Sequence, residues 1–73
     1  MTLGKEEKIE IVGQHIKNLE YNKYNITLSI IEENAATIPN QSVLDSLAIQ
    51  ESDINAKINA LNIELTELNN ING

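Results

Sequence analysis

The side chains of this 73-residue chain that could take part in chemistry are few and lie apart from one another. The chain has one histidine, His15, and no cysteine, and none of its serines sits in a Gly-x-Ser-x-Gly turn. A helical metal site such as His-Glu-x-x-His needs a further ligand at a set spacing, and no carboxylate stands at that spacing from His15. We therefore expect no catalytic, cofactor-binding or metal-binding residue, and a protein that is not an enzyme.

Charge and composition restrict the partners. The formal net charge is −6, with five lysines and no arginine, which argues against nucleic acid and anionic membranes as partners. No apolar run approaches the roughly 20 residues of a membrane span, and the N-terminus lacks the basic-then-apolar pattern of a signal peptide. We also expect no small-molecule substrate, which leaves other proteins or further copies of the chain as partners.

The element that dominates the sequence is a heptad repeat in residues 44–68. Apolar residues alternate there at spacings of three and four, which is typical of a helix that pairs lengthwise with another helix. A second repeat of the same kind runs through residues 9–30. Together the two repeats form what we call the seam: Ile9, Val12, Ile16, Leu19, Ile26, Ile30, Leu44, Leu47, Ile54, Ile58, Leu61, Leu65 and Leu68.

Only one strong helix breaker separates the two repeats. Pro39 disfavours the helical conformation of Ile38, and either Asn40 or Ser42 can cap the helix that follows, Ser42 having capping-box spacing to Asp45. A short connection between helices of similar length predicts an all-α, antiparallel two-helix coiled-coil hairpin that assembles into a helical bundle. The expected division of the single domain 1–73 is helix 5–34, turn 35–41 and helix 42–69, with a tail 70–73 that frays.

The first helix is expected to begin after Gly4, an acceptable N-cap, with Glu6 and Glu7 at the positive end of the helix dipole. Gly13 lies inside this helix, where glycine costs about 1 kcal/mol relative to alanine. We interpret it as a tolerated glycine, and a close approach of another helix is the alternative.

Two polar residues interrupt the seam, Lys23 in the first helix and Glu51 in the second. If facing residues have numbers that sum to 77, Leu19 meets Ile58, and the two polar residues fall in neighbouring layers. A polar core pair of Lys23 and Glu51 could fix the register of the helices. The alternative is that both side chains extend along the surface into water.

Apolar residues also lie away from the seam, which a lone hairpin does not require. The outer stripe of the first helix comprises Tyr21, Tyr24, Leu28, Ile31 and Ala35, and the outer row of the second helix comprises Ile49, Ala56 and Ile63. We predict a partner interface formed by Tyr21, Tyr24, Leu28, Ile31 and Ile49, in the half of the hairpin near the turn. The alternative is a hairpin with a few exposed aliphatic side chains.

The segments 6–11, 15–25 and 31–35 resemble the small helical proteins encoded by marine tailed bacteriophages. The resemblance covers the first half of the chain and implies a structural or accessory phage protein, located in the host cytoplasm or the virion. The function expected is therefore self-association or docking on a larger assembly. The alternatives are a small acidic regulator of a host enzyme and a chaperone with coiled-coil arms like those of prefoldin.

Overall fold

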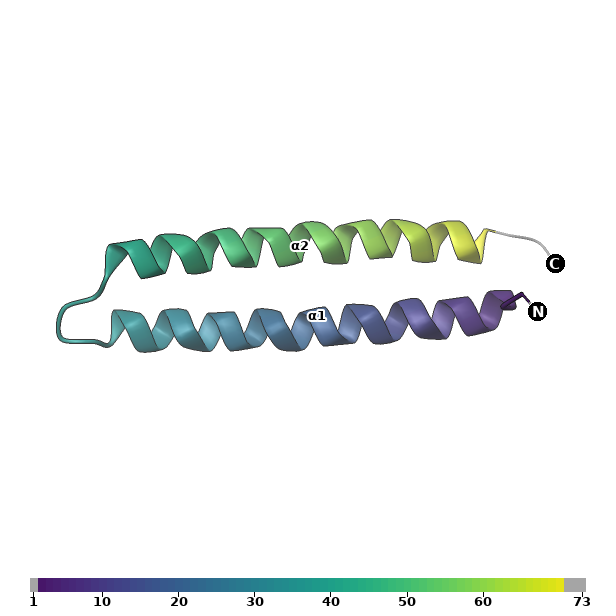
Figure 1. Ribbon diagram of the computed structural model, residues 1–73. Helices are drawn as coiled ribbons and strands as arrows, with labels where there is room; N and C mark the ends of the chain where they lie inside the picture. Colours follow the sequence, from purple (N-terminus) through teal and green to yellow (C-terminus); the bar gives the residue numbers. More distant parts are fainter. Residues whose placement is uncertain (1, 71–73) are drawn as a thin grey trace.

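The computed structural model describes residues 2–70 and shows an all-α, antiparallel helical hairpin (Figure 1). Helix α1 spans Lys5–Asn34 and helix α2 spans Gln41–Asn69. The predicted fold class is confirmed for the hairpin. Residues 71–73 of the tail expected to fray lie outside the described residues. The start of α1 and the end of α2 lie at one end of the molecule and the turn lies at the other (Figure 1).

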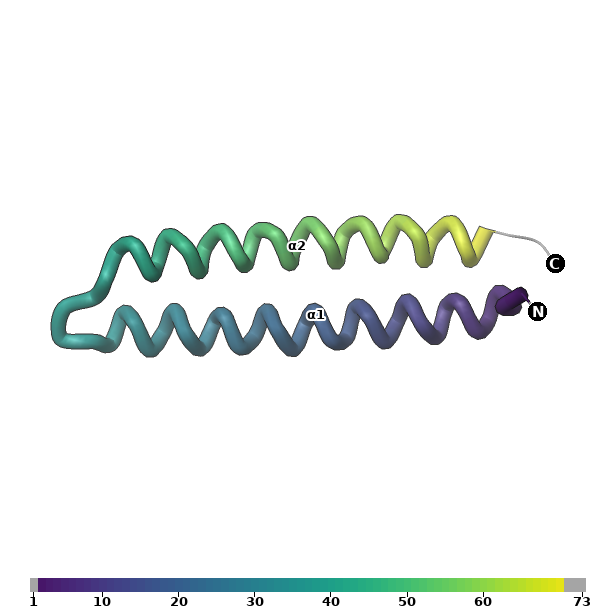
Figure 2. The backbone as a smooth tube through the Cα atoms, in the orientation of Figure 1, coloured from purple at the N-terminus to yellow at the C-terminus, as the bar shows by residue number. Residues whose placement is uncertain are grey.

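The molecule is a thin rod. Its extents are 58 × 17 × 14 Å and its radius of gyration is 16.8 Å, against about 11 Å for a compact chain of this length. Figure 2 shows α1 and α2 running side by side along their whole length, joined by the turn. Only one side chain among the described residues, that of Leu68, is buried, with 4% of its surface accessible. The hairpin therefore has a single line of contact where a globular domain would have a core.

Helix α1 begins without a side-chain cap. Gly4 is the N-cap residue in an extended conformation, and its carbonyl oxygen accepts a hydrogen bond from the Lys8 N–H at 3.0 Å. Glu6 and Glu7 lie in the first turn, where carboxylates interact favourably with the exposed N–H groups. At the other end, the Ala35 N–H donates to the Ile31 carbonyl oxygen at 3.1 Å. The observed bounds equal the expected range 5–34.

Helix α2 begins one residue earlier than expected because Asn40 caps it. The Asn40 side-chain oxygen accepts from the Val43 N–H at 3.3 Å. The Asn40 N–H in turn donates to a Glu33 carboxylate oxygen at 2.8 Å. In a capping box this second bond comes from a residue of the same helix. Here the carboxylate comes from Glu33 of α1. The two hydrogen bonds of Asn40 therefore cap the start of α2 and also connect it to the end of α1.

Candidate interaction surface

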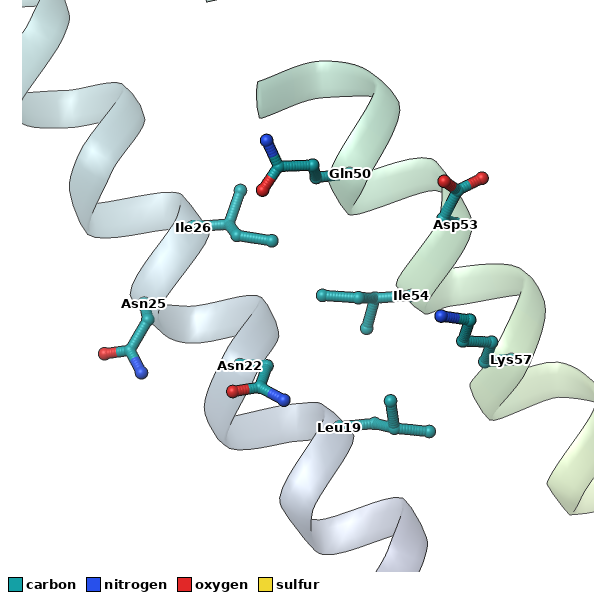
Figure 3. Close-up of a pocket in the computed structure, with 8 residues that line it drawn as sticks. All are labelled: Leu19, Asn22, Asn25, Ile26, Gln50, Asp53, Ile54 and Lys57. Atoms are coloured by element: carbon teal, nitrogen blue, oxygen red, sulfur yellow. The ribbon is translucent and has the colours of Figure 1, made fainter. Parts of the chain in front are cut away.

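The structure places the seam between the two helices. Leu68 is buried and the other twelve seam residues are half-buried, whereas the other large apolar side chains of residues 2–70 are mostly exposed. In Figure 3, Ile54 of α2 lies between Leu19 and Ile26 of α1, as expected if facing residue numbers sum to 77. The seam is therefore occupied by contacts between the two helices of one chain, and it is not available for contacts with a partner.

The two residues of the predicted polar core pair occupy seam positions, but they do not form an ion pair. Lys23 and Glu51 are both half-buried, and within residues 2–70 no ion pair joins them. The Lys23 backbone carbonyl accepts from the Thr27 hydroxyl at 3.1 Å, a local bond within α1. The arrangement matches the alternative in which each long side chain lies along the helix surface and reaches water.

Charged residues also occupy the two ends of the α1 seam, and sequence reasoning missed both. Lys5 and Glu33 continue the three-four spacing beyond Ile9 and Ile30, and both are half-buried. Lys5 Nζ donates to the Asn69 carbonyl oxygen at 3.5 Å, while Glu33 accepts from Asn40. A cation therefore lies at the C-terminal end of α2 and a carboxylate at its N-terminal end, which suits the helix dipole at both ends. Continuing the heptad count by one step would have found them.

A shallow hollow of about 430 Å³ lies on one side of the hairpin. Figure 3 shows Leu19, Ile26 and Ile54 projecting into the space between the helices, with polar side chains around them. The polar lining residues are Asn22, Asn25, Gln50, Asp53 and Lys57. The hollow is open along its length, and each of these five polar residues is exposed. It is therefore an open depression beside the seam and not an enclosed pocket.

The outer stripe is exposed to solvent. Its four large side chains, Tyr21, Tyr24, Leu28 and Ile31, retain between 39% and 63% of their accessible surface. The Lys17 ammonium group lies 5.9 Å from the centre of the Tyr21 ring, within the range of a cation–π contact. Lys17 therefore marks the boundary between the apolar half of this face and its polar half.

The residues of the predicted partner interface lie on two faces of the hairpin, with Ile49 apart from the four residues of α1. An α-helix turns about 100° per residue, so Ile49 lies about 170° around α2 from the seam, and it is 63% exposed. The outer stripe lies about 150° around α1 from the seam. Because the seams face each other, these two surfaces point in nearly opposite directions. Similar height along the hairpin does not bring Ile49 beside Leu28.

Further apolar side chains near the turn were not included in the predicted interface. Ile38 is 86% exposed, and Val43 is also exposed. Their signal in the sequence was weak, because one lies in the turn and the other has no periodic neighbours. They add to the concentration of apolar surface in the half of the hairpin near the turn.

His15 is exposed on α1. Across residues 2–70, no group of three or more His, Cys, Asp or Glu side chains could hold a metal ion. In the same part of the chain, neither helix combines the length and the apolarity needed to cross a membrane. No protein-family model, curated protein or solved structure matches this chain.

Proposed function

We propose that this chain is a non-enzymatic structural or accessory protein that associates with other protein chains through the outer stripe of α1. The observation that supports this most is the exposure of Tyr21, Tyr24 and Ile31, each close to 60%. Contiguous exposed aromatic and aliphatic side chains are typical of protein–protein contact sites. The seam is already used within the chain, and among the exposed apolar surfaces that remain the outer stripe carries more large side chains than the outer row of α2.

The extent of the surface supports the same proposal. The chain exposes 5594 Å², about a quarter more than the roughly 4,500 Å² of a globular monomer of its mass. A hairpin of this size with one line of contact is marginally stable alone. Burying part of the excess surface against another chain adds stability that the monomer lacks.

The assembly that we propose is a phage particle, because the first half of the chain resembles small helical phage proteins. The chain would then act in the virion or, before assembly, in the host cytoplasm. Association with purified particles is the corresponding experiment. If the chain is absent from particles, the phage assembly is the wrong partner.

The proposed function is tested by replacing Leu28 and Ile31 with glutamate together. Both side chains are exposed, so α1 stays helical in circular dichroism, while the two charges oppose burial of the outer stripe. A matched control carries the same two charges at exposed α2 positions outside both apolar surfaces, as Ser52→Glu and Asn59→Glu. We expect the first variant to lose self-association or binding to particles and the control to keep it. Unchanged association of the Leu28→Glu, Ile31→Glu variant would overturn the proposal.

A further inference from the structure

We propose that the partner of the outer stripe is a second copy of this chain, whose α1 packs antiparallel against the first α1 about a two-fold axis. This inference rests on the proposed function and specifies the partner and the geometry. It follows from the spacing of the stripe, from the charges beside it and from its direction relative to the seam.

The spacing makes the outer stripe a second helix-pairing surface. Tyr21, Tyr24, Leu28, Ile31 and Ala35 alternate at steps of three and four, the same repeat that pairs α1 with α2. The outer row of α2 is a single column, flanked by the polar residues Ser52 and Asn59. The stripe of α1 presents two columns and therefore offers the better surface for another helix.

An antiparallel register brings apolar side chains together in four layers. When facing numbers sum to 52, Tyr24 meets Leu28 of the second copy and Tyr21 meets Ile31, and each contact occurs twice because of the two-fold axis. The axis then passes close to residue 26. This register uses the four large side chains of the stripe and leaves the polar half of α1 outside the contact.

The charges beside the stripe favour this register. Residues that flank the contact meet at sums two below or two above 52: Glu32 lies beside Asn18 of the second copy (sum 50) and Glu20 lies beside Asn34 (sum 54). Each carboxylate therefore meets an amide that can donate a hydrogen bond. Lys17 lies beside the C-terminal end of the other α1, which carries Glu32 and Glu33 and no basic residue in its last turn. A parallel pairing would instead place Lys17 against Lys17, a repulsive contact at a facing position.

The direction of the stripe decides the shape of the dimer. In a closed four-helix bundle each helix meets its neighbours on faces about 90° apart. The seam and the outer stripe are about 150° apart around α1. The four helices therefore form an open layer in the order α2, α1, α1, α2, and not the closed bundle expected from the sequence.

The area of the contact indicates a reversible dimer. The exposed parts of two tyrosines and two aliphatic side chains amount to roughly 400 Å² per chain, given about 150–250 Å² for a whole aromatic side chain. A standard stable interface buries about 800 Å² per partner. The dimer is therefore expected to dissociate on dilution. The two copies overlap only in the halves near their turns. The dimer is therefore about 80 Å long, compared with 58 Å for the hairpin.

Crosslinking tests the arrangement, since the chain has no native cysteine. Asn25 lies next to its own copy across the axis, so Asn25→Cys should give a covalent dimer with a short bis-maleimide reagent. Ser52→Cys is the matched control, because Ser52 is exposed at the same height on α2. A mixture of Asn18→Cys and Glu32→Cys chains should give mainly the mixed dimer, identified by its mass.

Three outcomes would overturn the antiparallel dimer. Preferential crosslinking through Ser52→Cys would place the contact on α2, and absence of the mixed dimer would exclude the register. A wild-type chain that binds particles but stays monomeric alone would refute the second copy as partner while leaving the proposed function intact. If the Leu28→Glu, Ile31→Glu variant kept both particle binding and dimerisation, the proposed function itself would be refuted.

Discussion

Replacing the two half-buried charges of the seam, Lys23 and Glu51, with leucine should raise the stability of the hairpin. Each side chain interrupts a line of apolar contacts, and no ion pair between them offsets the loss. Full burial of a leucine side chain contributes about 1.5–3 kcal/mol. A half-buried one contributes less, and part of that is already supplied by the aliphatic stems of Lys23 and Glu51.

We therefore expect each single change to raise the free energy of unfolding by about 0.5–1 kcal/mol, and the double change by about 1–2 kcal/mol. For a domain of this size, 1 kcal/mol corresponds to about 4–8 °C in melting temperature. The coupling energy of the double-mutant cycle should be below about 0.5 kcal/mol, as for independent sites. Urea and thermal unfolding followed by circular dichroism, at one fixed protein concentration, supplies these values.

Glu67→Leu is the control, because Glu67 is exposed on α2 away from the seam, and it should leave stability nearly unchanged. Two side chains that reach water independently would be excluded if Glu51→Leu alone lowered stability while the double change raised it. That pattern is typical of a buried pair, in which loss of one partner leaves an uncompensated charge. A coupling energy well above 1 kcal/mol would likewise indicate a buried pair.

Two further substitutions test the local structure of α1. Gly13→Ala should stabilise the chain by about 1 kcal/mol, because no atom beyond the adjacent residues and the backbone of α1 itself lies within 4 Å of the added methyl group. A loss of stability or of association would mean that another helix packs closely there. Glu33→Ala should cost about 1 kcal/mol in urea denaturation by removing the acceptor for the Asn40 N–H. Glu32→Ala, at the exposed neighbouring residue, is the control. An equal loss of stability in this control would contradict the capping role of Glu33.

The hairpin could be predicted from the sequence because its causes are local or periodic. Burial of one helix face requires apolar residues at spacings of three and four, so the seam is visible in the order of residues alone. Pro39 marks the turn for an equally local reason. The choice between Asn40 and Ser42 as the cap could not be made in that way. It depends on Glu33, which reaches the start of α2 from the other helix.

The candidate surface could be predicted only in part. Heptad position showed that Tyr24 and Ile49 lie off the seam, and both are exposed. Their joining into one interface stays a prediction, because it considered height along the rod without direction around each helix, and the two side chains point to opposite sides of the hairpin. Likewise, the spacing located Lys23 and Glu51 in neighbouring layers, but long flexible side chains can reach water from such positions. Whether they meet depends on rotamers that sequence spacing does not determine.

Sedimentation equilibrium of the wild-type chain over a wide concentration range tests whether the chain associates through the outer stripe of α1. We expect a mass that rises from that of the 8.1 kDa monomer to that of the dimer as concentration increases. We expect the Leu28→Glu, Ile31→Glu variant to keep the monomer mass throughout. A wild-type chain that stays monomeric at every concentration and is absent from purified particles would mean that the outer stripe is not an association surface.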